Sequence, residues 1–340
     1  MHTQLFGPIL WILLAWMVAG CTAVVPAAQS ASVPVTTVAN PDALVDTAWV
    51  TENLDNPNVR LLAIHSKRED YDAGFLPGAI YIHLGENLTN PDDPTEGQIL
   101  TQEALSALFS QLGIENDDTL VVYDGNNNLL AARAYWVFKY YQHADVRLYD
   151  GGLTQWVAAG NSLSSEPVAL PASSYVAGDA DAALRTTGDY VLEQLEDPNT
   201  LLCDARGPGE YAGTDVRAAR GGHIPGAINV DWAEAVNQET GTFKPVSDLA
   251  ALYQKAGFAP DKQIITYCQT GVRGAHTWFV LSQLLGYPDV RRSRFGSLGW
   301  QLVLPAQRWT RRSRANWLPS RRGWDAGTRQ RSSPPAADRS

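Results

Sequence analysis

Short apolar runs alternate with helix-length amphipathic segments along most of the chain. In the first half, four apolar runs have the length of β-strands: 60–64, 79–83, 120–123 and 146–149. Amphipathic segments with the length of helices lie at 101–112, 131–141 and 153–159. Thr101 is the residue type that often caps a helix N-terminus. This alternation predicts an α/β fold, with a mostly parallel sheet flanked by helices on both faces.

The same pattern occurs twice. Residues 76–82 read LPGAIYI, and residues 224–230, 148 positions later, read IPGAINV. The apolar run LVVYD at 120–124 returns as IITYC at 264–268, and a helical stretch follows each run. The near-constant spacing indicates a duplication. It predicts two tandem domains, 41–165 and 184–290, joined by a linker over 166–183.

The composition fits two globular domains. The chain has 340 residues, of which 45% are hydrophobic and 18% are charged, and this excludes a wholly disordered protein. Cys21, Cys203 and Cys268 are too few for a disulfide framework. The net charge of −10 argues against nucleic acid as a partner.

The first twenty residues predict an export signal. Residues 9–20 are all apolar or glycine, a run shorter than the roughly 20 residues that span a membrane and typical of a signal peptide. The run ends in VAGC at 18–21, which resembles the lipobox of bacterial lipoproteins. We therefore expect a signal peptide over 1–20, lipidation of Cys21, and a lipoprotein anchored to the membrane of the bacterial cell envelope. A plain secretory signal or a short hydrophobic anchor is the alternative, and 21–40 is predicted as a flexible tether.

One loop carries residues suited to nucleophilic chemistry. Residues 268–273 read CQTGVR and lie between a predicted strand and a helix, at the edge where α/β folds bind ligands. Backbone N–H groups at such a loop favour an anion and lower the pKa of a thiol from about 8.5. Gly271 allows a tight turn, and Arg273 supplies a guanidinium for an oxyanion. Cys268 is therefore predicted to be a reactive thiol.

Together with the segment GHIPGAI at 222–228, the sequence YCQTGVR at 267–273 looks like the rhodanese family. Two tandem units with the cysteine only in the second resemble the two-domain thiosulfate sulfurtransferases, over about residues 41–290. The resemblance implies two rhodanese-like domains. It also implies that Cys268 attacks the outer sulfur of thiosulfate, expels sulfite and passes the resulting persulfide sulfur to cyanide or a thiol acceptor. No metal or organic cofactor is implied.

The resemblance also assigns the residues around the nucleophile. The backbone amides that would cradle the persulfide belong to Gln269, Thr270, Gly271, Val272 and Arg273. Arg273 would also hold the anionic substrate, Asp204 would order the loop, and Arg206 would support the loop or the substrate. Arg206 could instead form an ordinary surface ion pair. Glu210 departs from the animal enzymes, which have a substrate-binding arginine there, so the substrate stays open.

The first domain is expected to be catalytically inactive. Asp124 occupies the position of the cysteine, and a carboxylate cannot form a persulfide. We place Ile64 and Ser66 at the positions equivalent to Asp204 and Arg206. The role of this domain is then to pack against the second and to shape the cleft.

Two other functions stay open beside thiosulfate sulfur transfer. A 3-mercaptopyruvate sulfurtransferase shares the fold and the persulfide, but its loop more often reads CGSG, so Arg273 favours thiosulfate. A non-catalytic persulfide carrier or binding module is the second alternative. The related phosphatases have Cys-x5-Arg, whereas Cys268 and Arg273 enclose four residues. The oligomeric state is not predicted.

The C-terminal segment 291–340 departs from the pattern. It contains twelve arginines, no lysine and two acidic residues, giving +10, whereas residues 1–290 carry −20. Arg292 and Ser293 fall where a strand is expected, so we expect the second domain to lose a strand and a covering helix. A basic tail that binds anionic lipid or nucleic acid is one hypothesis, and translation out of frame from about residue 291 is the other.

The remaining notable residues have structural explanations. Cys203 is predicted to be a buried structural thiol, although a redox partnership with Cys268 stays open. His276 is predicted to lie on a helix surface. Trp136, Trp156 and Trp278 fall at helical core positions.

Overall fold

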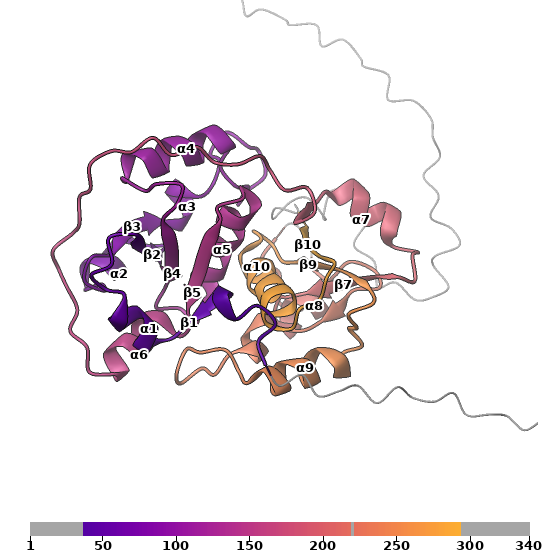
Figure 1. Cartoon of the computed structure of the whole chain (residues 1–340). Coiled ribbons are helices and arrows are strands. Elements are labelled where there is room, and N and C mark those ends of the chain that lie inside the picture. Colours follow the sequence, from indigo (N-terminus) through magenta and orange to yellow (C-terminus); the bar gives the residue numbers. More distant parts are fainter. Residues whose placement is uncertain (1–36, 219–220, 294–340) are drawn as a thin grey trace, which may run out of the picture. The chain divides into compact units, whose positions relative to one another are not determined.

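The computed structural model describes residues 37–218 and 221–293, which form two parallel five-stranded sheets (Figure 1). The first sheet has the order β1-β5-β4-β2-β3, with strands Leu44–Val45, Asp145–Tyr149, Thr119–Tyr123, Val59–His65 and Ile80–His83. The second has the equivalent order β6-β10-β9-β7-β8, with strands Arg185–Thr186, Val290–Ser293, Gln263–Tyr267, Thr200–Asp204 and Ile228–Asn229. The predicted tandem α/β fold is confirmed. The predicted signal peptide, Cys21, most of the predicted tether and residues 294–340 lie outside the described residues.

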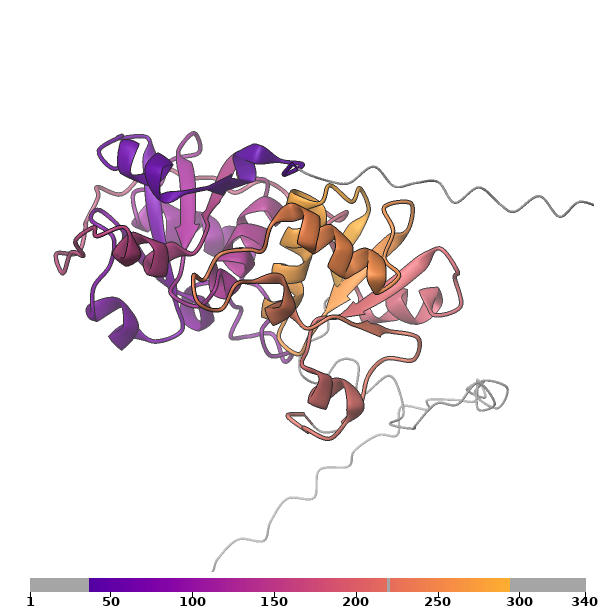
Figure 2. The ribbon, with the colours of Figure 1, turned by 90° about the horizontal axis from the view of Figure 1, so that it is seen from below.

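Helices cover both sheets, as the view in Figure 2 shows. Those of the first domain are α1 (Thr47–Glu52), α2 (Arg68–Asp72), α3 (Leu84–Asn87), α4 (Gln102–Gln111), α5 (Leu129–Tyr140) and α6 (Gly152–Ala158). Those of the second are α7 (Gly188–Gln194), α8 (Pro208–Ala212), α9 (Val246–Lys255) and α10 (Val272–Phe279), which continues as the π-helix η3 (Val280–Leu284). Short 3-10 turns occur at Pro41–Ala43 and Trp232–Ala235. Thr101 caps α4 as predicted, since its hydroxyl accepts a hydrogen bond from the Ala104 N–H.

Alternate residues of each central strand enter different cores. In β4, Leu120 and Val122 pack with residues of α4 and α5, whereas Val121 and Tyr123 pack with residues of α1, α2 and α6. Successive side chains of a strand point to opposite faces, so a strand of continuous apolar residues needs cover on both sides. This explains why the apolar runs in the sequence do not alternate with polar residues.

The two domains share one hydrophobic core. Helix α5 of the first domain packs against α10 of the second, with the rings of Tyr135 and Phe279 4.8 Å apart and edge to face. The Tyr135 hydroxyl also donates to Gln283 Oε1 over 3.1 Å. Helix α5 of the first domain therefore packs along the helix that follows Cys268.

The structure corrects two expectations about the ends of the second domain. The expected loss of a strand after residue 290 is wrong, because β10 forms through Ser293 and pairs with both β6 and β9. The boundary expected between residues 290 and 291 therefore falls inside β10. The strand forms because parallel pairing uses backbone groups, which the arginines supply as well as apolar residues would.

The linker and the end of the tether are also more ordered than the sequence indicates. Tyr175 is buried, and backbone bonds join Ser173 N–H to Ser110 O (2.8 Å) and Gly178 N–H to Tyr141 O (2.9 Å). At the tether end, Ala39 N–H donates to Leu284 O over 3.0 Å. Both segments therefore pack on the domains, since small and polar residues can hydrogen-bond through their backbone without an apolar pattern.

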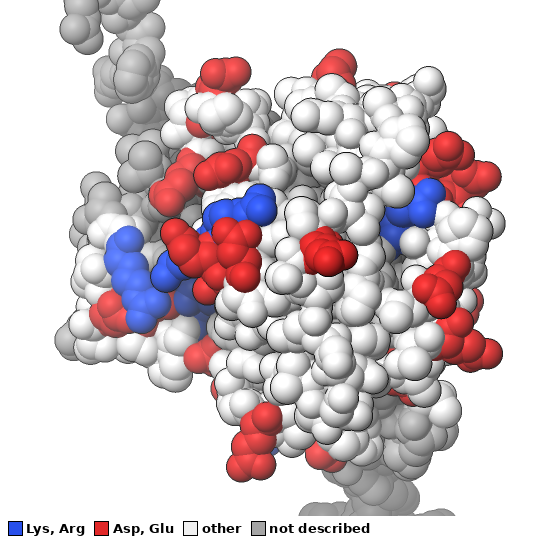
Figure 3. Space-filling model, turned by 90° about the vertical axis from the view of Figure 1, so that its left-hand side faces the viewer, with Lys and Arg blue, Asp and Glu red and all other residues white. Residues whose placement is uncertain are grey.

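Acidic side chains are scattered over the face shown in Figure 3, with few basic ones beside them, in keeping with the net charge. Within the described ranges, no helix combines the length and the apolar character needed to span a membrane.

Candidate active site

Cys268 lies directly after β9 and opens the loop that leads into α10. Its side chain is buried, and Sγ accepts a hydrogen bond from the Gly271 N–H over 3.1 Å. Gly271 has φ +84°, a conformation that favours glycine, and this turns the N–H inward toward the sulfur. The thiol therefore sits at the N-terminus of α10, where backbone N–H groups and the helix dipole stabilise a negative sulfur.

Arg273 is held by an ion pair at the rim of this loop. Its Nη1 lies 2.5 Å from Glu210 Oε2 and its Nη2 lies 3.1 Å from Glu210 Oε1, while Nη2 also donates to Gln269 Oε1. Burial alone would raise the pKa of Glu210, but the hydrogen bonds and charge of Arg273 outweigh burial and lower it. Arg273 is thus close to Cys268, as predicted, but its guanidinium is engaged by a carboxylate. Glu210, on α8, joins the site through this pair.

Asp204 and Arg206 form a buried pair beneath the loop. Arg206 donates two bonds to the carboxylate, from Nε (2.9 Å) and from Nη2 (2.6 Å), and neither side chain is exposed by more than 2%. The Tyr267 hydroxyl, from the residue before Cys268, also donates to Asp204 over 2.8 Å. The alternative of a surface ion pair for Arg206 is therefore wrong. Asp204 and Arg206 fix the end of β9 from which the loop starts.

Two further arginines reach the loop, and sequence reasoning missed both. Arg133 comes from α5 of the first domain and Arg292 from β10, and each is 2% exposed. A Cβ built on Gly271 would collide with Arg292 and would lie 3.4 Å from Arg133 Nη1. Neither residue belongs to the loop motif, so no spacing in the sequence pointed to them. Arg133 falls within an apolar helical stretch, LLAARAYWVF at 129–138, and a charge at such a position is the signal that could have found it.

The equivalent loop of the first domain closes around Asp124. This carboxylate accepts four backbone N–H bonds, from Asn126 (2.7 Å), Asn128 (3.1 Å), Leu130 (2.6 Å) and Ala131 (2.8 Å). Burial raises the pKa of Asp124, and the four N–H donors oppose that rise. The first domain thus also has backbone amides that face into its loop, but its own side chain occupies them.

The strand register corrects the positions paired with Asp204 and Arg206. Asp204 pairs with Tyr267, and Ala63 pairs with Tyr123, the residue before Asp124. Ala63 and His65 are therefore the equivalents, and the assignment to Ile64 and Ser66 is off by one. A one-residue shift moves a side chain to the other face of the sheet. The sequence alone does not fix this register, because residues 63–66 share no motif with residues 204–206.

The remaining predicted residues lie in the interior. Cys203 is fully buried in β7 and unpaired, as predicted for a structural thiol, and burial raises its pKa. His276 does not lie on a helix surface, because it is fully buried between Trp232 and Phe243. Burial lowers its pKa to about 3, so it is a neutral core residue. Trp136, Trp156 and Trp278 are buried as expected.

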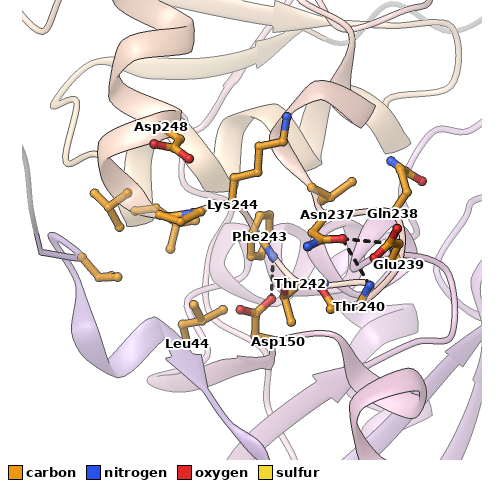
Figure 4. Close-up of a pocket in the computed structure, with 15 residues that line it drawn as sticks. Leu44, Asp150, Asn237, Gln238, Glu239, Thr240, Thr242, Phe243, Lys244 and Asp248 are labelled. Atoms are coloured by element: carbon orange, nitrogen blue, oxygen red, sulfur yellow. Dashed lines mark hydrogen bonds between the residues drawn. The ribbon is translucent and has the colours of Figure 1, made fainter. Parts of the chain in front are cut away.

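A separate cavity of about 930 Å³ lies between segment 236–248 of the second domain and Leu44 and Asp150 of the first (Figure 4). Asp150 closes its floor by accepting the Phe243 N–H over 2.9 Å. No residue of the Cys268 loop lines this cavity, so it is distinct from the candidate active site. In the described part of the chain, no cluster of three or more histidine, cysteine or acidic residues could hold a metal ion.

The comparisons with known proteins agree with this geometry. The model of the rhodanese-like domain matches twice, at residues 46–159 and 187–302. A "Putative thiosulfate sulfurtransferase" of Mycolicibacterium smegmatis is 40% identical over 274 residues, which are 77% of this chain and 97% of that protein. The "Sulfur carrier protein TtuD" of Thermus thermophilus is 41% identical over 264 residues, or 74% and 91% of the two chains.

Among solved structures, the 3-mercaptopyruvate sulfurtransferase SseA of Escherichia coli superposes with a TM-score of 0.68 at 27% identity, over 75% of this chain and 98% of that one. The Tum1 protein of Saccharomyces cerevisiae, at 22% identity and a TM-score of 0.68, shares the fold. The chain therefore belongs to the rhodanese family, contains two rhodanese-like domains, and falls among the sulfurtransferases of that family.

Proposed function

We propose that this protein is a thiosulfate sulfurtransferase that carries sulfur as a persulfide on Cys268. The observation that supports this most strongly is the position of Sγ at the N-terminus of α10, where it accepts the Gly271 N–H. That position places a backbone N–H donor beside the sulfur, where it can stabilise the negative charge of the persulfide. The relatives named as thiosulfate sulfurtransferases support the choice of donor.

The reaction has two steps. In the first, the Cys268 thiolate attacks the outer sulfur of thiosulfate, a new S–S bond forms, the S–S bond of thiosulfate breaks, and its electron pair leaves with sulfite. In the second, cyanide or a thiolate attacks the terminal sulfur of the persulfide, and the electron pair of that S–S bond returns to Cys268. Covalent catalysis of this kind predicts ping-pong kinetics, with sulfite released before the acceptor binds.

A sulfur-carrier role is the second candidate. The relative named TtuD is a sulfur carrier protein, and here Glu210 occupies both η-nitrogens of Arg273. A guanidinium that is already paired binds a donor anion less strongly, so the persulfide could be loaded by a protein donor instead of thiosulfate. Mercaptopyruvate, the substrate class named for SseA, is the alternative small donor. The loop sequence CQTGVR, which differs from the CGSG more often found in mercaptopyruvate sulfurtransferases, favours thiosulfate over it.

Steady-state kinetics with three variants test the proposal. We expect the wild-type protein to form thiocyanate from thiosulfate and cyanide with parallel double-reciprocal lines. Cys268→Ser should lose activity by more than roughly 1,000-fold, since the nucleophile is gone. Cys203→Ser is the matched control, because this thiol is buried in β7 and should leave the rate unchanged. A folded wild-type protein that forms persulfide from neither small donor would reject the enzyme and favour the carrier.

We further propose that the enzyme acts outside the cytoplasm, held to the membrane by lipid on Cys21. The motif VAGC at 18–21 supports this. Detergent-phase partitioning of the protein expressed in a bacterium, compared with a Cys21→Ala variant, tests it. Equal partitioning of both proteins into the aqueous phase would contradict lipidation.

A further inference from the structure

The first domain contributes one buried cation to the catalytic loop of the second. Arg133 lies on α5, is 2% exposed, and donates from Nη2 to the Gly97 carbonyl over 2.9 Å. Its Nη1 lies on the Gly271 side, 3.4 Å from where a Cβ on that glycine would stand, while the Gly271 N–H bonds Cys268 Sγ. The guanidinium therefore lies beside Gly271, the residue whose N–H contacts the sulfur of Cys268.

In the part of the chain that the structure describes, this cation forms no ion pair. Among the described residues, Nη1 of Arg133 has no hydrogen-bond partner, and no carboxylate pairs with its guanidinium. Burial lowers its pKa to about 9, repulsion from Arg185 adds to this, and the charge of Cys268 opposes it. A buried charge left unpaired is strongly destabilising, and an anionic ligand would supply the missing partner.

An opening leads to this guanidinium from outside. A cavity of about 280 Å³ is lined by Arg133 and Gly97 of the first domain and by Thr270 and Val272 of the catalytic loop. The cavity is thus bounded by both domains, and its lining includes the Arg133 guanidinium and the side chain of one acidic residue, Glu96. A volume of this size accepts a small tetrahedral anion together with water molecules.

We propose that Arg133 binds the anionic oxygens of the sulfur donor, so that the domain without a nucleophile supplies part of the substrate site. This inference rests on the proposed function and deepens it, because it specifies a doubly charged oxyanion such as thiosulfate. Arg273 is neutralised by Glu210, whereas the charge of Arg133 is uncompensated and free to pair with substrate. The hydrogen bond from Nη2 to the Gly97 carbonyl holds the guanidinium of Arg133 in place and leaves its Nη1 to donate to the substrate.

Arg292 adds to the positive field but does not carry the argument. Its guanidinium stacks 3.9 Å above the Trp136 ring, and its Nε and Nη2 have no partner among the described residues. Leu148 holds the equivalent position in the first domain, so the two domains do not share an arginine at this position. Arg133, in contrast, is tied to both domains by its contacts.

Binding measured without chemistry tests the inference. We would titrate sulfate and thiosulfate into Cys268→Ser protein by calorimetry and repeat the titration with Cys268→Ser/Arg133→Met. Loss of one charge-assisted pair should weaken binding by roughly tenfold or more, equivalent to about 1.4 kcal/mol. Arg147→Met in the same background is the control. Arg147 lies over the Trp49 ring as Arg133 lies over the Trp136 ring, but Arg147 forms an ion pair with Asp145.

Kinetics of the single Arg133→Met variant separate substrate binding from folding. We expect KM for thiosulfate to rise at least tenfold with kcat changed less than about threefold, and Arg133→Lys to recover part of the affinity. Equal affinity and KM in Arg133→Met and wild type would overturn the inference while leaving the proposed function standing. If wild type transfers no sulfur, the titrations still decide whether Arg133 binds the anion. A far-UV spectrum shows that each variant is folded.

Discussion

In the first domain the loop after β4 closes around Asp124, whereas in the second domain the loop after β9 closes around Cys268. Both loops begin after a tyrosine at the end of the central strand and lead into the helix at the domain junction. Asp124 accepts four backbone N–H bonds through its own carboxylate, but Cys268 Sγ accepts one. The loop of the first domain is thus filled by its own carboxylate, whereas we propose that the loop of the second receives the anionic sulfur.

The largest expected effect on stability comes from removing the Asp124 carboxylate from the loop of the first domain. Asp124→Ala leaves four inward N–H groups without an acceptor in a buried site, so we expect the free energy of unfolding to fall by about 3 to 5 kcal/mol. Urea denaturation of the wild-type and Asp124→Ala proteins measures this difference in the free energy of unfolding.

Asp124→Asn is the matched control for that measurement. Its Oδ1 can still accept from Asn126 and Asn128, while its amide N–H groups face the donors of Leu130 and Ala131. The loss should therefore be smaller than for alanine. A change below about 0.5 kcal/mol for Asp124→Ala would show that the loop does not depend on an internal anion.

A second comparison concerns β5 and β10, in which Leu148 and Arg292 hold the same register position. Leu148 is fully buried among apolar residues, while Arg292 is buried with Nε and Nη2 unpaired among the described residues. Burial, then repulsion from Arg133 and Arg185, lowers the pKa of Arg292. Arg292→Leu should therefore raise the free energy of unfolding by about 1 to 4 kcal/mol.

The reverse change in the first domain sharpens this comparison. Leu148→Arg places an unpaired charge in a complete apolar core and should destabilise by roughly 3 to 5 kcal/mol. Thermal unfolding of both variants provides the check. If Arg292→Leu lowers the melting temperature, Arg292 is a native part of the second domain, and the hypothesis of out-of-frame translation loses its structural support.

The smallest expected effect concerns the Glu210–Arg273 pair, which has no counterpart in the first domain's loop. Glu210→Gln removes the negative charge beside the catalytic loop and leaves Arg273 free to attract an anionic donor. We expect KM for thiosulfate to fall about three- to tenfold, equivalent to about 1 kcal/mol. Glu86→Gln, on exposed α3, is the control. An unchanged KM would assign Glu210 a purely structural role.

Much of the fold followed from the sequence because its signals are local or repeated. The apolar runs at 120–123 and 146–149 fall within β4 and β5, and Thr101 caps α4 as its residue type indicates. The two-residue strands β1 and β6 were missed, because two residues are too few to show a period.

The candidate active site was predictable only where its residues share a motif. Cys268, Gly271 and Arg273 lie in one loop, and the sequence places them together. The partners of that loop, Glu210, Arg133 and Arg292, come from α8, α5 and β10. Residues that meet only because their elements pack together are not separated by a regular interval in the sequence, so no motif reveals them. The prediction for His276 was wrong for the same reason, since its burial depends on Trp232 and Phe243.

The difference between the two loops is tested most directly by intact mass spectrometry with peptide mapping. Protein from about residue 37 onward would be weighed before and after thiosulfate, then again after cyanide. The account predicts a gain of one sulfur, about 32 Da, located on the peptide with Cys268 and lost on adding cyanide. No gain in a folded protein, or sulfur on Cys203 instead of Cys268, would contradict it.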